Sequence, residues 1–142
     1  MMNRRKLALL LLLSLFACIK ASILSTGEDV NDFVNKYIEE HDVMIFAKST
    51  CPHCKNSKKV LDILEKKTGM VGWNARFLYL DYMSADGPKI HAALVEKTGH
   101  TTVPNVFIAG KHVGGNAELT NMYESGELLK TIKDISMAKV KA

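Results

Sequence analysis

The sequence predicts a small α/β domain built on a mixed four-stranded sheet with helices on both faces. Three observations support this class: strand-like apolar runs alternate with amphipathic helical stretches, a hairpin pattern follows them, and a helical segment closes the chain. With 142 residues, of which 47% are hydrophobic and 24% charged, the chain can bury one modest core. We therefore expect a single globular domain over residues 30–142.

The first half of this domain alternates helix and strand. Ser25 and Glu28 are expected to form a capping box ahead of the first helix. Val43–Ala47 and Arg76–Leu80 are short apolar runs typical of strands, and Asn56–Thr68 between them has helical spacing of its apolar residues. Strand, helix and strand in this order favour a parallel pair. The first helix is predicted from an apolar stripe at helical spacing: Val30, Phe33, Val34, Tyr37 and Ile38.

The second half predicts a helix, a hairpin and a final helix. Pro88–Lys97 is the expected helix, because it carries apolar residues at helical spacing and ends before a glycine. Val103–Ala109 and Lys111–Val113 flank a single glycine and are expected to pair as a hairpin. The last helix is expected over Glu118–Met137, with a break at Ser125–Gly126.

Residues 1–21 have a different character from the domain. Three basic residues at positions 4–6 precede the nearly continuous apolar run Leu7–Ile19, which is the layout of a signal peptide. The run is shorter than the roughly 20 apolar residues that a spanning helix needs. We expect cleavage after Ala21, with an uncleaved signal anchor as the alternative, and a linker over residues 22–29. Either way we expect the secretory pathway: the lumen of the endoplasmic reticulum or Golgi, secretion, or attachment to a membrane.

The basic charge of the chain belongs to this leader. Cleavage would remove Arg4, Arg5, Lys6 and Lys20, which lowers Lys plus Arg from 19 to 15 against 15 Asp plus Glu, so the net charge falls from +4 to zero. Nucleic-acid binding would need a clustered basic face. The sequence therefore predicts no nucleic-acid partner.

Cys51-Pro52-His53-Cys54 is the strongest chemical feature of the chain. It lies where a predicted strand ends and a predicted helix begins, and Pro52 suits the first helical turn because its missing N–H breaks no bond there. A helix N-terminus and a CxxC motif lower a cysteine pKa from ~8.5 to about 3.5–7.5. We predict that Cys51 is the nucleophile and that Cys54, further into the helix, is the resolving thiol.

Two other uses of a CxxC motif are less favoured. A structural zinc site needs four ligands, yet the only other cysteine, Cys18, lies in the leader, and the histidines lack partner spacing. A purely structural disulfide between Cys51 and Cys54 would close almost no chain and would constrain the unfolded state little. We therefore expect a redox centre and no metal.

Three segments of the chain together resemble the signatures of glutaredoxins, and they occur in the same order. These are Phe46–Cys54 (FAKSTCPHC), Thr102–Ile108 (TVPNVFI) and Gly114–Leu119 (GGNAEL). The resemblance extends from about Val30 to the end of the chain. It implies a thioredoxin-like fold and glutathione-dependent thiol–disulfide exchange, with glutathione as co-substrate.

Glutathione carries two carboxylates, an ammonium and a peptide backbone, so its site must offer a cation, main-chain hydrogen bonds and an anion. Lys48, three residues before Cys51, is the expected cation for the glycyl carboxylate and would also favour the thiolate. In the family, the bond before the proline that matches Pro104 is cis, which leaves the main chain of Val103 free for the glutathione backbone. The N–H groups of Asn116 and Ala117 would receive the γ-glutamyl carboxylate at a helix N-terminus. The glutathione-binding residues implied by the resemblance are Lys48, Thr102, Val103, Pro104, Gly115, Asn116, Ala117 and Glu118.

The chain departs from the family pattern at three positions. Ala117 and Glu118 replace a small polar residue and an aspartate, so the contact with the glutathione ammonium has a longer reach. His53 replaces a common tyrosine, and the Pro52-His53 dipeptide is similar to that of DsbA, a strong disulfide oxidant. We expect Pro52 and His53 to tune the redox couple, with the His53 imidazole stabilising the Cys51 thiolate and making the couple more oxidising. The remaining histidines are expected to be surface residues without a role: His41, His91, His100 and His112.

Three functions fit these features. The first is a glutathione-dependent oxidoreductase that reduces protein–glutathione mixed disulfides through Cys51, with glutathionylated or disulfide-containing proteins as partners. The second is a secretory-pathway disulfide oxidase or isomerase, which His53 and the leader favour. The third is an iron–sulfur carrier bridged by two copies of Cys51 and two glutathiones, which Pro52 disfavours.

Overall fold

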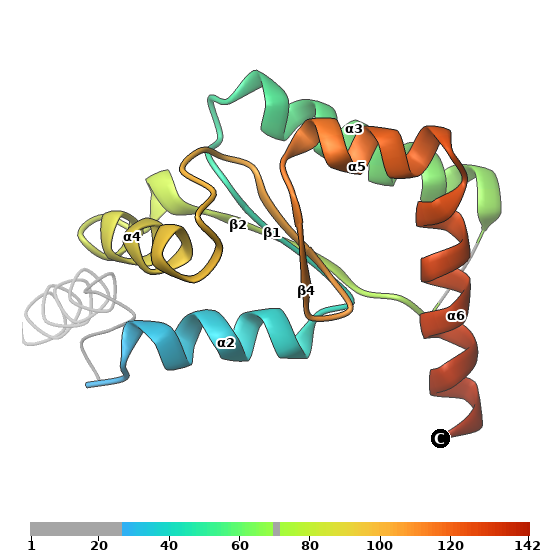
Figure 1. Cartoon of the computed structure of the whole chain (residues 1–142), viewed down its shortest axis with the longest axis horizontal. Helices are drawn as coiled ribbons and strands as arrows, with labels where there is room; N and C mark the ends of the chain where they lie inside the picture. The colour runs from blue at the N-terminus through green and yellow to red at the C-terminus, as the bar shows by residue number, and fades with distance from the viewer. Residues whose placement is uncertain (1–26, 70–71) are drawn as a thin grey trace, which may run out of the picture.

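The computed structural model describes residues 27–69 and 72–142 of the chain (Figure 1). The elements in chain order are α2 (Val30–Glu40), β1 (Val43–Ala47), α3 (Pro52–Thr68), β2 (Ala75–Tyr79), the short helix η2 (Leu80–Tyr82), α4 (Asp86–Thr98), β3 (Asn105–Ile108), β4 (Lys111–Gly114), α5 (Asn116–Glu124) and α6 (Glu127–Lys141).

The four strands form one mixed sheet in the order β2-β1-β3-β4. Strand β1 pairs in parallel with β2, where Val43 lies opposite Ala75. It pairs antiparallel with β3, where Val43 lies opposite Ile108, and β3 and β4 form the antiparallel hairpin. The predicted parallel pair, hairpin and mixed four-stranded sheet are confirmed.

Both faces of the sheet are covered, because successive side chains of the central strand β1 point to opposite faces. Met44 and Phe46 pack against α2 and α4, whereas Val43, Ile45 and Ala47 pack against α3, α5 and α6. Figure 1 shows α2 on one side of the strands and the α3–α5 pair on the other. Every residue of β1 is 0% exposed, so the end of this strand, from which the chain leads to Cys51, is fixed in the core.

Helix α2 begins at Val30, later in the chain than a capping box of Ser25 and Glu28 would place its start. Asp29 is its N-cap, and the Asp29 Oδ1 atom accepts a hydrogen bond from the Asn31 N–H at 2.7 Å. The capping box of Ser25 and Glu28 is therefore wrong: Glu28 precedes the helix, and Ser25 lies outside the described residues. An aspartate directly before the apolar stripe is itself a strong N-cap, and this explains the later start.

Other boundaries shift by one or two residues. Leu80, predicted as the end of the second strand, begins η2 instead, and α4 begins at Asp86 rather than Pro88. Strand β3 begins at Asn105, after the Val103–Pro104 peptide bond.

The final helical segment is two helices. The predicted break at Ser125–Gly126 is confirmed, with Gly126 at a φ of 80°, a value that favours glycine. Helix α5 begins at Asn116, two residues before the predicted start at Glu118. This earlier start is important because it places the α5 N-terminus directly after Gly114 and Gly115.

Within the described ranges, no helix is both long enough and apolar enough to span a bilayer. The predicted leader over residues 1–21, its cleavage after Ala21 and most of the predicted linker lie outside the described residues. That division of the chain stays a prediction, although α2 begins at Val30.

Candidate active site

The two cysteines lie at the junction between the buried strand β1 and helix α3. Cys51 is the N-cap of α3 and Pro52 is its first residue, as predicted. The Cys51 side chain is half-buried, while Cys54, one turn into the helix, is 2% exposed and packs in the core. The strand-to-helix corner thus presents one thiol to solvent and buries the other.

The environment of Cys51 favours its thiolate. Partial burial is the largest single influence on the pKa of Cys51 and raises it. Three hydrogen bonds lower it, from the main chain and the thiol of Cys54 and from the main chain of His53, and so does the positive charge of Lys48. Together these outweigh burial, and the pKa of Cys51 is lowered. These main-chain donors belong to the free N-terminal N–H groups of α3. The thiol also lies 3.6 Å from the carbonyl oxygen of Val103.

Cys54 has the opposite environment. Burial raises the pKa of its thiol to about 12, and the neighbouring Cys51 and the carboxylate of Asp81 add to the increase. At neutral pH Cys54 is therefore a neutral thiol beside a Cys51 that ionises readily. This difference is what a nucleophile and a resolving cysteine require.

Lys48, three residues before Cys51, lines a cavity. The cavity has a volume of about 400 Å³ and is lined by Lys48, Asp81 and His91, among others. His91 was expected to be a surface residue without a role, yet helix α4 brings it to the same cavity as Lys48. Its proximity to Lys48 depends on how α4 packs, which no local pattern in the sequence indicates.

The loop before β3 closes the second side of the site. The Val103–Pro104 bond is cis, and Pro104 is buried. Thr102 is exposed, and its Oγ1 atom lies 3.2 Å from Nε2 of His100. The predicted residue Val103 is therefore directly beside the Cys51 thiol, and Pro104 follows it across the cis bond, whereas Thr102 lies against a histidine.

The third side is the N-terminus of α5. Gly114 and Gly115 are buried, and a Cβ atom on Gly114 would lie 2.8 Å from Cγ of Glu118. Glycine is favoured there because its φ is 130°. The Glu118 side chain folds back into the space that a Cβ atom would fill, and its Oε2 atom accepts a hydrogen bond from the Gly115 N–H at 2.7 Å. This hydrogen bond is the largest cause that lowers the pKa of Glu118, and the charges of His100 and His112 act in the same direction.

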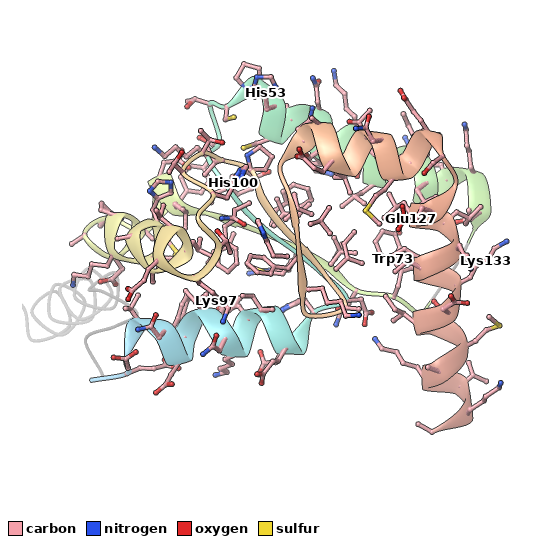
Figure 2. All side chains as sticks on the ribbon, viewed as in Figure 1. His53, Trp73, Lys97, His100, Glu127 and Lys133 are labelled. Atoms are coloured by element: carbon pink, nitrogen blue, oxygen red, sulfur yellow. The ribbon has the colours of Figure 1, made fainter. Side chains whose placement is uncertain are left out.

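Two histidines lie beside this carboxylate. The rings of His100 and His112 are 5.8 Å apart, and a Cβ atom on Gly115 would lie 3.2 Å from Cε1 of His100. Burial, followed by the charge of His100, lowers the pKa of His112. Figure 2 shows His100 between α4 and the sheet. The sequence did not predict this cluster.

Asn116 and Ala117 begin helix α5, as the resemblance requires for N–H groups that receive a carboxylate. Asn116 is half-buried and its Oδ1 atom accepts a hydrogen bond from Ser57 Oγ at 3.1 Å. Ser57 lies on α3 and is 0% exposed, so the bond ties the N-terminal end of α5 to the cysteine helix. Ala117 is exposed and makes no such link.

His53 is exposed at the start of α3, and Figure 2 shows it at the outer end of that helix. Its main-chain N–H is one of the groups that lower the pKa of Cys51. The predicted effect of its imidazole on the redox couple stays a prediction. Among the described residues, no group of three or more His, Cys, Asp or Glu side chains is placed to hold a metal ion.

Comparison with known proteins identifies the family. The family model named Glutaredoxin matches residues 43–113, a range that contains both cysteines, Lys48 and the cis bond. The chain is similar to Glutaredoxin-C4 of Arabidopsis thaliana, with 41% identity over 124 residues, 87% of this chain and 84% of the relative. It is also similar to Glutaredoxin-1 of Bos taurus, with 36% identity over 104 residues, 72% of this chain and 92% of the relative.

Solved structures agree with the sequence relatives. A buckwheat glutaredoxin–glutathione complex matches with a TM-score of 0.66 and 31% identity, covering 75% of this chain and 89% of that chain. The holo form of glutaredoxin C1 from Populus tremula x tremuloides matches with a TM-score of 0.64 and 30% identity, covering 76% of this chain and 99% of that chain. The chain therefore belongs to the glutaredoxin family of glutathione-dependent thiol–disulfide oxidoreductases, which have the thioredoxin-like fold seen here, with Cys51 and Cys54 as its cysteine pair.

Proposed function

We propose that this protein reduces protein–glutathione mixed disulfides, with the Cys51 thiolate as the nucleophile. One observation carries the proposal: a half-exposed Cys51 thiol with a lowered pKa lies beside a buried Cys54 thiol with a pKa of about 12. Only the thiolate attacks a disulfide, so Cys51 reacts first.

The reaction proceeds by two exchanges at Cys51. Its thiolate attacks the glutathione sulfur of the mixed disulfide, a Cys51–glutathione disulfide forms, and the protein sulfur leaves as a thiolate that takes up a proton. The thiolate of a second glutathione then attacks the sulfur of the bound glutathione. Oxidised glutathione leaves, and the Cys51 thiolate is regenerated.

Three parts of the structure support a glutathione site around Cys51. Lys48 supplies a cation for the glycyl carboxylate, and the main chain of Val103 lies beside the sulfur. The N–H groups of Asn116 and Ala117 at the α5 N-terminus are suited to the γ-glutamyl carboxylate. Glu118 is the acidic group on this end, and the glutathione complex of the buckwheat relative supports glutathione as the co-substrate.

A second route uses Cys54. Its thiol is hydrogen-bonded with that of Cys51. Once deprotonated, Cys54 can attack the Cys51 sulfur, release glutathione and form the Cys51–Cys54 disulfide. That disulfide could oxidise a dithiol client, which is the disulfide oxidase or isomerase alternative. The contact between the two thiols is the observation that favours this second candidate.

Turnover of a small glutathione mixed disulfide by the purified full-length protein, coupled to glutathione and glutathione reductase, tests the proposal. We expect Cys54→Ser to retain activity and Cys51→Ser to lose it. Wild-type protein that is inert in this assay yet oxidises a reduced multi-disulfide client would overturn the first function and support the second.

We also propose that the protein acts in the secretory pathway, on glutathionylated or disulfide-containing proteins there. The basic and apolar layout of residues 1–21 supports this location. Fractionation of its native cells tests the location: protein protected from added protease inside sealed membrane vesicles supports it, and protein recovered in the cytosol overturns it. For protein found in the vesicles, N-terminal sequencing then distinguishes cleavage, with a chain that begins at Ser22, from an anchor, with a chain that begins at Met1.

A further inference from the structure

Asp81 contacts the nucleophile loop from outside the three glutaredoxin signatures. Its Oδ1 atom accepts a hydrogen bond from the Ser49 N–H at 2.9 Å, and its Oδ2 atom accepts a second bond from the Ser49 hydroxyl. The two residues are 32 positions apart in the sequence. One carboxylate therefore binds both the main chain and the side chain of a residue two positions before Cys51.

The loop that Asp81 contacts is a tight turn. The Cys51 N–H donates a hydrogen bond to the Lys48 carbonyl at 3.2 Å, so Ser49 and Thr50 are the two central residues of that turn. The turn begins directly after the fully buried strand β1 and ends at the N-cap of α3. Its two ends are Lys48, which faces the cavity, and Cys51, which carries the reacting sulfur.

Asp81 is itself held in place. It is the middle residue of η2, where the Met83 N–H donates to the Leu80 carbonyl at 3.1 Å. A Cβ atom on Gly87 would lie only 2.1 Å from the Leu80 oxygen, so this glycine lets α4 pack directly on η2. The Asp81 side chain is exposed, but its backbone is held by this packing, so its carboxylate can fix the position of the 48–51 turn.

The negative charge of Asp81 acts on Lys48 and Cys54, two residues of the site. Its two hydrogen bonds from Ser49 lower the pKa of Asp81, with a further contribution from Lys48, so it is an anion at neutral pH. Asp81 and Lys48 line one cavity. Asp81 also contributes to the raised pKa of Cys54.

We propose that Asp81 is a positioning residue for the thiol–disulfide exchange: through Ser49 it holds the 48–51 turn, so that the Lys48 ammonium and the Cys51 sulfur face one bound glutathione. Asp81 touches neither glutathione nor a reacting sulfur in this role. The inference rests on the proposed function, because it assumes that Cys51 is the nucleophile.

Two variants separate the geometry of Asp81 from its charge. In Asp81→Asn the amide oxygen can still accept the Ser49 N–H and the amide nitrogen can donate to the Ser49 hydroxyl, so the turn keeps its support without the charge. Asp81→Ala removes both bonds. Asp62→Ala is the matched control, because Asp62 is an exposed carboxylate on α3 that pairs with Lys58.

The readouts are kcat and KM for a glutathione mixed disulfide, and the pH dependence of alkylation followed on the Cys51 peptide of the full-length protein by mass spectrometry. We expect Asp81→Ala to lower kcat/KM by about tenfold to a hundredfold, because misplacement of a reacting group by ~1 Å has effects of this size. Its alkylation profile should shift to higher pH. The kcat/KM of Asp81→Asn should stay within about threefold of the wild-type value. The kcat/KM of Asp62→Ala should equal the wild-type value.

A purely structural role would lower the melting temperature and leave the Cys51 profile unchanged, and that result overturns the inference. Equal losses in Asp81→Asn and Asp81→Ala also overturn it, since charge and not position would then be responsible. If Asp81→Ala does not fold, Ser49→Ala provides the test, because it removes only the hydrogen bond from the Ser49 hydroxyl. A shift of the Cys51 alkylation profile to higher pH than in wild type supports the inference, and an unchanged profile overturns it.

The proposed function fails separately. Wild-type protein without turnover, or turnover retained by Cys51→Ser, contradicts the function itself. Turnover that depends on Cys51 but is unaffected in Asp81→Ala contradicts only the role of Asp81.

Discussion

Glu118 caps the helix that it belongs to, because its Oε2 atom accepts the N–H of Gly115 at 2.7 Å. The sequence predicted a longer reach from Glu118 towards the glutathione ammonium, and the structure shows the extra methylene used to fold the carboxylate back onto the main chain. The same carboxylate lies beside His100 and His112. One side chain thus supports the α5 N-terminus and supplies a negative charge there, at the end of the site proposed for the γ-glutamyl part of glutathione.

We predict that Glu118→Ala lowers the free energy of unfolding by about 0.5 kcal/mol at pH 7, the low end for a lost cap because the side chain is solvent-exposed. The folded pKa of Glu118 is depressed, so its stabilisation is present above the unfolded value of about 4.3 and is lost as pH falls through the folded pKa. Urea denaturation at several pH values measures this. Equal destabilisation at every pH would contradict the assignment, and Glu124→Ala, at the other end of α5, is the control.

Lys48→Gln should weaken both glutathione binding and the Cys51 thiolate. We expect KM for glutathione to rise by about three- to tenfold, since a hydrogen bond to a charged group is worth about 1.5–3 kcal/mol before solvent screening. The Cys51 alkylation midpoint should rise by less than about one pH unit, because the Lys48 charge is the smallest of the causes that lower its pKa. Lys59→Gln, an exposed lysine on α3, should change neither value.

Cys54 should make the reduced protein less stable at alkaline pH. Its folded pKa is raised to about 12 from an ordinary value of 9.0, so above about pH 9 the unfolded chain loses a proton that the folded protein retains. The free energy of unfolding should then fall by up to about 1.4 kcal/mol per pH unit relative to Cys54→Ser, whose side chain does not titrate. Denaturation with a reductant present between about pH 8 and pH 11 provides this comparison. Parallel curves for the two proteins would show that Cys54 is not a buried neutral thiol.

His53→Tyr tests the redox role of the imidazole. We expect the Cys51 pKa to rise and the couple to become more reducing, since a cation or donor at this position stabilises the thiolate and favours the dithiol form. Equilibration of each protein with mixtures of reduced and oxidised glutathione gives the potential. His53→Gln distinguishes the charge of the ring from its bulk. An unchanged Cys51 pKa in the tyrosine variant would contradict a role of the imidazole. His53 would then lower the pKa of Cys51 only through its main-chain N–H.

Local patterns were sufficient for most of the fold. The fully buried strand Val43–Ala47 appears in the sequence as an uninterrupted apolar run, and the break at Ser125–Gly126 follows from a glycine at positive φ. Cys51 and Pro52 were predicted at a helix start because a proline suits the first turn. The capping of α2 was wrong because two local caps competed, and Asp29 lies nearer to the apolar stripe than Ser25.

The parts of the site that the sequence missed are tertiary contacts. Asp81 meets Ser49 across 32 positions because β1 and β2 run in parallel and end side by side. His91 lines the same cavity as Lys48 only through the packing of α4. His100 approaches Gly115 because the loop before β3 lies against the start of α5. None of these pairs has a spacing that a single sequence could reveal.

The mechanism requires Cys51 to carry glutathione during turnover, and intact-mass measurement of the trapped intermediate detects this species. Cys54→Ser protein, incubated with a glutathione mixed disulfide and without free glutathione, should gain the mass of one glutathione, and peptide mapping should place it on Cys51. Cys51→Ser should gain none, either at the substituted position or at Cys54. A Cys54→Ser protein that gains no glutathione, or that becomes linked to the substrate through Cys51 instead, would contradict the mechanism.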